Sequence, residues 1–192
     1  LSALASDAGA DAVVLATPYY FSTDQQELTQ YVHHIVPELA LPVMLYNIPS
    51  ATKVWFDFET VKSLTSLTTI LGLKDSSADL NYYARVCELQ SERPDWSFFM
   101  GPEELMVQSI SLGGSGGVNG GANVFPRLFV EAYDAAVSGD TIRGNALQSV
   151  IEDFGEIYNF GAKSSRYIKT TKCAASILGL CDDFMAEPFK RL

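Results

Sequence analysis

Short apolar runs recur along this sequence at intervals of roughly 20 to 30 residues, with amphipathic segments between them. The runs end near Ala16, Tyr46, Lys74, Met100 and Val118. They are apolar at successive positions rather than at alternate ones, which is typical of parallel strands covered by helices. Because a strand alternating with a helix at this interval is the βα unit, the pattern predicts an α/β fold with a parallel sheet.

The segments between the runs carry helical signals, among them a predicted N-cap within Ser22 to Asp24 and another at Asp79. Helices are predicted at about residues 24–35, 57–64, 79–89, 103–112 and 123–137. The run at residues 117–118 is predicted to be a short strand. After residue 138 the pattern changes, and residues 141–160, residues 163–180 and the short C-terminal segment are predicted to be helices with no strand between them.

A β/α barrel with a C-terminal helical extension fits this order best, and a doubly wound sheet is the alternative. The domain organisation that follows is a partial barrel over residues 1–138 and a helical region over residues 139–192.

The composition excludes several classes of protein. The chain has 192 residues, 47% hydrophobic and 19% charged, which suits a globular domain with an ample core. A formal net charge of −10 disfavours nucleic acid and anionic membrane surfaces as partners. No stretch reaches the roughly 18 apolar residues of a membrane span. Three cysteines without C-x-x-C spacing fit free thiols in a reducing, cytoplasmic compartment, and only two adjacent histidines, His33 and His34, disfavour a zinc site.

The unusual residues lie where the predicted strands end. Tyr46 ends one strand, Lys74 ends the next, and Gly101 and Glu103 follow the third. In parallel βα folds the reactive groups gather at the carboxyl ends of the strands. A desolvated lysine amine can attack a ketone to form a Schiff base, and a neighbouring phenol can transfer the proton of a substrate hydroxyl.

Each of these residues also has a purely structural interpretation. Lys74 could extend its head group to water from the strand end, or form an ion pair with Asp75. Tyr46 could be a core aromatic with a satisfied hydroxyl. Neither residue decides between the two interpretations alone.

Taken together, the segments VMLYNIPSAT, LGLKDSSAD, PYYF, GVNGGANVFP and KTTKCAASILGL resemble the pyruvate-dependent class I aldolase family. This family includes dihydrodipicolinate synthase, N-acetylneuraminate lyase and 2-keto-3-deoxygluconate aldolase. The resemblance covers essentially the whole chain and implies a (β/α)8 TIM barrel of which this sequence matches the fourth to eighth strands. The first three βα units and a paired-hydroxyl loop that binds the pyruvate carboxylate have no counterpart, and the chain does not begin with Met, so we expect a longer native protein.

The resemblance also implies roles for particular residues, each matched to the family's motifs. Lys74 corresponds to the Schiff-base lysine and Tyr46 to the catalytic acid/base tyrosine. Tyr20 corresponds to a tyrosine that reaches a neighbouring subunit's site in several members, which implies a homo-oligomer, a dimer or tetramer. Three further residues correspond to substrate-binding positions: Ser76, Gly101 and Glu103. Val118 corresponds to a position whose backbone carbonyl lines the pyruvyl pocket.

The implied activity is that of a lyase or aldolase acting on pyruvate and an aldehyde, without a metal or an organic cofactor. Dihydrodipicolinate synthases carry an arginine at the position of Ala51, where it holds the second substrate's carboxylate. Ala51 favours the 2-keto-3-deoxy sugar acid type of substrate, although Lys53 could supply the cation. Dihydrodipicolinate synthase, N-acetylneuraminate lyase and a non-catalytic barrel module stay open as alternatives.

Overall fold

A computed structural model describes residues 1–161 and 165–192 of the chain. These residues divide into two compact units. The sheet unit consists of Leu1–Gly101 and Leu112–Gly116, and the helical unit of Pro102–Ser111 and Gly117–Leu192. This division follows internal packing, and the predicted domain boundary at residue 138 stays a prediction.

The strands form a single five-stranded sheet in the order β1-β2-β3-β4-β5. Its strands are β1 Val13–Ala16, β2 Val43–Asn47, β3 Ile70–Asp75, β4 Ser97–Met100 and β5 Gly116–Gly117. The pairs β1–β2, β2–β3 and β3–β4 are parallel, which confirms the predicted parallel α/β sheet. A doubly wound sheet reverses its strand order, whereas this order follows the chain in one direction. The order therefore favours the barrel interpretation, and closure into eight strands stays a prediction.

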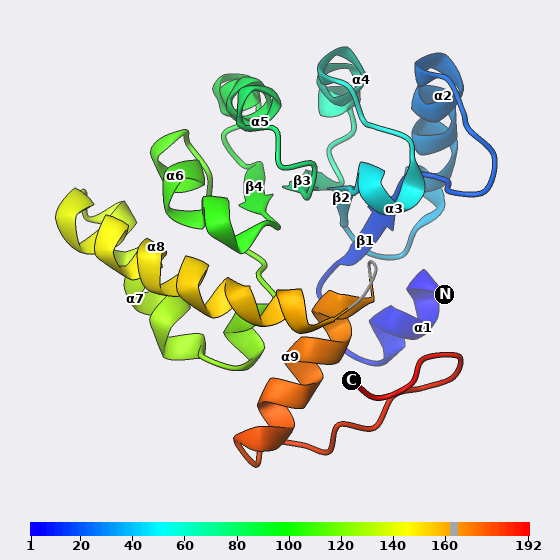
Figure 1. The fold of residues 1–192 in the computed structure, drawn as a ribbon. Helices are drawn as coiled ribbons and strands as arrows, with labels where there is room; N and C mark the ends of the chain where they lie inside the picture. Colours follow the sequence, from blue (N-terminus) through cyan, green and yellow to red (C-terminus); the bar gives the residue numbers. More distant parts are fainter. Residues whose placement is uncertain (162–164) are drawn as a thin grey trace. The chain divides into compact units, whose positions relative to one another are not determined.

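Helices α2, α4 and α5 of the sheet unit stand in a row along one side of the strands (Figure 1). The bounds of this unit's helices, with the short 3-10 helices η, are α1 Ser2–Asp7, α2 Gln25–Ile35, η1 Val36–Glu38, α3 Pro49–Thr52, α4 Phe58–Ser63, η2 Leu64–Ser66, α5 Leu80–Cys87 and η3 Glu88–Ser91. Asp24 and Asp79 cap α2 and α5 as predicted, and Asp57 caps α4 in the same way. The core between helices and sheet buries Leu28, Val32, Val43, Leu45, Val61, Leu64, Ile70, Leu73, Tyr83, Val86 and Phe98.

The helical unit packs around a core of five buried residues, Met106, Val107, Phe129, Ala132 and Ile151. Its elements are η4 Glu103–Leu105, α6 Met106–Ser111, η5 Gly121–Asn123, α7 Pro126–Val137, α8 Thr141–Gly155, η6 Glu156–Phe160 and α9 Arg166–Ile177. The helices predicted at residues 103–112, 123–137 and 141–160 are confirmed. The helix predicted over residues 163–180 corresponds to α9, and its first two residues lie outside the described part of the chain. No helix among the described residues is long and apolar enough to cross a membrane.

Two predictions about local structure need correction, one in its bounds and one altogether. The strand predicted at residues 117–118 instead covers Gly116–Gly117, and Val118 lies beyond it. The Asn119 side chain occupies the space beside Gly117, where a Cβ would clash with it. The short C-terminal segment forms no helix. Asp182 accepts a hydrogen bond from the backbone N–H of Phe184, a local turn that competes with a helix, and Pro188 disfavours helical geometry in the residue before it.

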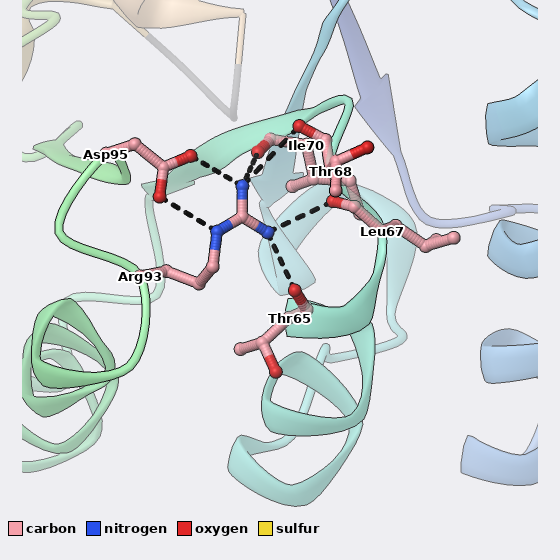
Figure 2. A network of polar contacts seen from close by, with 6 residues as sticks. All are labelled: Thr65, Leu67, Thr68, Ile70, Arg93 and Asp95. Atoms are coloured by element: carbon pink, nitrogen blue, oxygen red, sulfur yellow. Dashed lines mark hydrogen bonds and ion pairs between the residues drawn. The ribbon is translucent and has the colours of Figure 1, made fainter.

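A network of hydrogen bonds from Arg93 fixes the chain where it enters β3. The Arg93 guanidinium pairs with Asp95 and also donates to several backbone carbonyls at the end of η2 and the start of β3 (Figure 2). Those carbonyls belong to Thr65, Leu67, Thr68 and Ile70, at 2.7 to 3.5 Å. Hydrogen bonding from Arg93 lowers the pKa of Asp95 below its ordinary value. The strand that carries Lys74 is therefore anchored at its opposite end.

Candidate active site

Tyr46 and Lys74 lie side by side at the carboxyl ends of β2 and β3. The two residues are direct partners in the register of these parallel strands. The Lys74 Nζ lies over the Tyr46 ring, 4.2 Å from its centroid, and both residues are half-buried. Among the described residues, Lys74 takes part in no ion pair. Its ammonium group instead makes a cation–π contact with the Tyr46 ring.

Ser76 and Gly101 complete the same corner of the sheet unit. The Ser76 hydroxyl donates to the Tyr46 hydroxyl at 3.4 Å, a long bond, and the Ser76 N–H donates to the Asn47 carbonyl at 2.7 Å. The Gly101 N–H donates to the Asp75 carbonyl at 2.7 Å. A Cβ at Gly101 would clash with the Ser76 side chain, so only glycine lets the chain after β4 approach this closely.

Asp75 does not pair with Lys74, contrary to one of the structural interpretations of that lysine. Its side chain is completely buried and accepts from Asn47 Nδ2 at 2.9 Å and from the Ser77 hydroxyl at 2.7 Å. Burial raises the pKa of Asp75 above its ordinary value, and the hydrogen bonds from Ser77 and Asn47 oppose that rise. The sequence analysis did not identify Asn47 as a functional residue, although a polar side chain ending an otherwise apolar strand was a signal.

Glu103 belongs to the helical unit and is buried there. One carboxylate oxygen, Oε2, accepts from the Gly121 N–H at 2.7 Å, and the Tyr158 hydroxyl also hydrogen-bonds to the carboxylate. The other oxygen, Oε1, has no partner among the described residues. Burial raises the pKa of Glu103, and burial also raises the pKa of Tyr158 to about 12. Sequence reasoning missed Tyr158, because 55 positions separate two residues whose contact depends on how the helices pack.

The remaining predicted residues are exposed. Tyr20 is 83% exposed and meets the ring of Phe21 edge to face, with centroids 4.9 Å apart. Val118 is also exposed, in the helical unit. The structure thus brings Lys74, Tyr46, Ser76 and Gly101 together in the sheet unit, and it places Tyr20 on that unit's surface.

Ala51 and Lys53 lie on and directly after the short helix α3. Both are exposed, and Lys53 has a left-handed backbone with φ of 63° at the C-cap of this helix. That conformation favours glycine, so a lysine there carries a conformational cost. Nothing among the described contacts fixes the Lys53 ammonium in one place.

The arrangement of Lys74 and Tyr46 suits nucleophilic chemistry at a carbonyl. A lysine amine adds to a ketone, and a phenol within reach can transfer protons. Among the residues that the structure describes, no three His, Cys, Asp or Glu side chains are grouped so that they could hold a metal ion.

The sequence matches the model of the dihydrodipicolinate synthetase family over residues 1–192. The parallel βα sheet and the residues at its strand ends therefore belong to a known class of proteins. The chain is a member of the dihydrodipicolinate synthetase family. This confirms the resemblance inferred from the sequence motifs.

Two curated relatives are named 4-hydroxy-tetrahydrodipicolinate synthase. The one from Staphylococcus haemolyticus is 37% identical over 134 residues, which is 70% of this chain and 45% of the relative. The one from Pseudomonas aeruginosa is 34% identical over 147 residues, 77% of this chain and 50% of the relative. The chain therefore spans about half the length of these relatives.

Solved structures of the family superpose closely on this fold. Dihydrodipicolinate synthase from Bacteroides thetaiotaomicron matches with a TM-score of 0.93 at 45% identity, over 100% of this chain and 64% of that one. The chloride-inhibited dihydrodipicolinate synthase from Acinetobacter baumannii, complexed with pyruvate, matches with a TM-score of 0.88 at 27% identity, again over 100% and 64%.

Proposed function

We propose that this protein is a lyase or aldolase that binds pyruvate as a Schiff base on Lys74 and forms or breaks a C–C bond between pyruvate and an aldehyde. The single observation that carries the proposal is the position of the Lys74 Nζ, 4.2 Å from the Tyr46 ring centroid at the carboxyl ends of adjacent parallel strands. Membership of the dihydrodipicolinate synthetase family supports it.

In the proposed reaction the neutral Lys74 amine adds to the ketone of pyruvate, and uptake of one proton with loss of water gives a protonated imine. Loss of a methyl proton gives an enamine, and its carbon attacks the aldehyde carbonyl to form the new C–C bond. The Tyr46 phenol delivers a proton to the oxygen of that aldehyde. The electron-rich face of the Tyr46 ring stabilises the positive charge of the imine, because the Nζ lies over it. Water then hydrolyses the imine and frees Lys74.

The other matched residues have binding roles in this proposal. In the sheet unit, Ser76 contacts a hydroxyl group of the substrate and Gly101 contributes a substrate-binding position. The family resemblance assigns a hydroxyl contact to Glu103 and a backbone carbonyl to Val118 in the helical unit. The carboxylate oxygen of Glu103 that has no partner among the described residues suits a hydroxyl donor. Tyr20 acts between subunits of a cytoplasmic homo-oligomer, and its 83% exposure suits that role.

The test is reduction with borohydride in the presence of pyruvate, on the protein at its full natural length. A stable pyruvyl adduct should appear and should map to Lys74 by peptide mass spectrometry. Lys74→Ala should abolish it, while Lys62→Ala, which removes an exposed lysine paired with Glu92, should leave it intact. No adduct in the wild type, or an unchanged adduct in Lys74→Ala, would reject the proposal.

The aldehyde has two candidate classes. Ala51 favours a neutral polyol aldehyde, as in 2-keto-3-deoxy sugar acids, because it cannot pair with a carboxylate. The names of the curated relatives favour 4-hydroxy-tetrahydrodipicolinate synthase, whose aldehyde carries a carboxylate. Condensation assays with glyceraldehyde and aspartate semialdehyde separate the two, and absence of turnover with every 2-keto acid and aldehyde would favour a non-catalytic barrel module.

A further inference from the structure

We propose that the buried pair Asn47–Asp75 positions Tyr46 and Lys74 for their reaction by locking the register of β2 against β3. This inference rests on the proposed function. Asn47 and Asp75 follow Tyr46 and Lys74 directly along their strands, and they are themselves register partners. They are positioning residues and contact no substrate in this proposal.

The pair is tied into its surroundings by a set of short bonds. Asn47 Nδ2 donates to Asp75 Oδ1 at 2.9 Å, and Asn47 Oδ1 accepts from the Phe56 N–H at 3.1 Å. Asp75 accepts from the Ser77 hydroxyl at 2.7 Å and from the Ser77 N–H at 3.3 Å. The Phe56 carbonyl accepts from the Tyr82 hydroxyl at 2.6 Å. The network therefore joins both strands to the loops that follow them and to α5.

The two pairs lie on opposite faces of the sheet, because successive side chains of a strand point to opposite sides. Asn47 and Asp75 are 0% exposed, whereas Tyr46 and Lys74 are half-buried. A slip of one residue would pair Tyr46 with a different partner and would also break the Asn47–Asp75 bond. The buried face thus holds the register that the reactive face uses.

The register of β2 against β3 at their carboxyl ends differs from the register at their amino ends. Val43 pairs with Ile70 and Met44 with Gly72, so the pairing shifts by one residue between them. Gly72 has a φ of 134°, a conformation that side chains rarely adopt. Because the irregularity lies between the strand entrance and the site, a separate device is needed at the carboxyl ends.

A polar pair suits this task better than an apolar one. A buried amide and carboxylate are costly unless every group finds its partner, so they tolerate only one alignment, whereas apolar side chains pack in several. Displacing catalytic groups by about 1 Å can lower the rate on the order of 100-fold. A modest relaxation of the register would therefore affect turnover far more than folding.

The experiment uses the protein at its full natural length and three variants. Asn47→Asp places two carboxylates against each other. Asp75→Asn removes the charge and leaves two amides. The double variant Asn47→Asp/Asp75→Asn restores one amide facing one carboxylate in the reverse order. The measurements are kcat, the KM for pyruvate, the rate of borohydride trapping on Lys74 and the thermal unfolding midpoint.

We expect Asn47→Asp to lower kcat on the order of 100-fold and to change the KM for pyruvate by less than about threefold. The double variant should recover kcat to within roughly fivefold of the wild type, because the geometry returns although the charge has changed places. Recovery excludes a direct effect of the Asp75 charge on Lys74. Failure of the double variant to recover, while it stays folded, would overturn the proposal.

Tyr83→Phe is the matched control. It removes one fully buried hydroxyl that donates to the Phe98 carbonyl at 3.0 Å in the same unit. We expect it to lower the unfolding midpoint with kcat changed less than about twofold. If Asn47→Asp also kept kcat within twofold, the pair would be structural only and the proposal would be wrong.

Crystal structures separate this inference from the proposed function. A wild type that traps no pyruvate rejects the function, yet the positioning is still measurable. The distance from the Lys74 Nζ to the Tyr46 ring centroid, 4.2 Å in the wild type, should lengthen by about 1 Å in Asn47→Asp and return in the double variant. An unchanged distance in Asn47→Asp would overturn the positioning proposal by itself.

Discussion

At the scale of single residues, the proposed chemistry divides between Lys74 as nucleophile and Tyr46 as proton-transfer group. The two roles are separable. An imine can form on Lys74 without the Tyr46 hydroxyl, whereas that hydroxyl is required to deliver a proton to the aldehyde oxygen. The Ser76 hydroxyl donates to the Tyr46 hydroxyl at 3.4 Å, so it lies next to the proposed proton-transfer group.

Tyr46→Phe should therefore lower kcat for condensation by roughly 100- to 1000-fold and still permit borohydride trapping on Lys74. The ring face over which the Nζ lies is retained in this variant, so the imine keeps its cation–π contact. Stopped-flow turnover and adduct mass measured on the same sample test the separation. Equal loss of trapping and turnover would contradict it.

Ala51 bears on which aldehyde the protein accepts. A fixed cation opposite a distal carboxylate is worth about 1.5 to 3 kcal/mol, or about 10- to 150-fold in kcat/KM. We expect the wild type to prefer glyceraldehyde over aspartate semialdehyde, and Ala51→Arg to narrow or invert that preference. Competition assays with both aldehydes measure the ratio. A wild type that uses aspartate semialdehyde equally well would mean that Lys53 or another cation supplies the charge.

At the scale of elements, Arg93 shows how one side chain secures a strand entrance. It hydrogen-bonds four backbone carbonyls and the Asp95 carboxylate, and its side chain is only 14% exposed. These contacts add donors for backbone carbonyls where the chain passes from η2 into β3. The contact set of Figure 2 thus stabilises the strand that carries Lys74.

Arg93→Met should lower the free energy of unfolding by about 2 to 4 kcal/mol, because four backbone carbonyls lose their charged donor. Arg85→Met is the matched control: Arg85 is 59% exposed, 3.9 Å from Glu59, and should cost at most about 1 kcal/mol. Urea unfolding monitored by circular dichroism measures both. Equal losses in the two variants would refute the role given to the carbonyl contacts.

The elements that could be predicted from the sequence are those governed by local chemistry. The caps at Asp24 and Asp79 and the strand ends near Tyr46 and Lys74 follow from side-chain pattern alone. The adjacency of Tyr46 and Lys74 followed from one further rule, that consecutive parallel strands are often neighbours.

What could not be predicted depends on long-range packing. Nothing local distinguishes Asn47 as the buried partner of Asp75 until the faces of both strands are known, and the contact of Tyr158 with Glu103 requires the packing of the helical unit. The roles assigned to the site residues stay predictions that the experiments above address.

At the scale of the whole molecule, the strand order places β1 at one end of the described sheet. β1 pairs with β2 along one side, and Val14 in its middle is 62% exposed. A strand at the edge of a sheet offers backbone groups for pairing with another chain. The net charge of −10 opposes such association by repulsion between copies, and salt weakens that repulsion.

A polypeptide of residues 1–192 alone should therefore self-associate through β1, more strongly as salt is raised from about 20 to 500 mM. Val14→Lys should reduce this association, because a charged side chain on an edge strand disfavours pairing with a second copy. Val130→Lys on α7 of the helical unit, where Val130 is 57% exposed, adds the same charge outside the strand and should have little effect. Sedimentation velocity at matched concentrations distinguishes them. Equal reductions by both substitutions would show that net charge, rather than the β1 edge, controls the association.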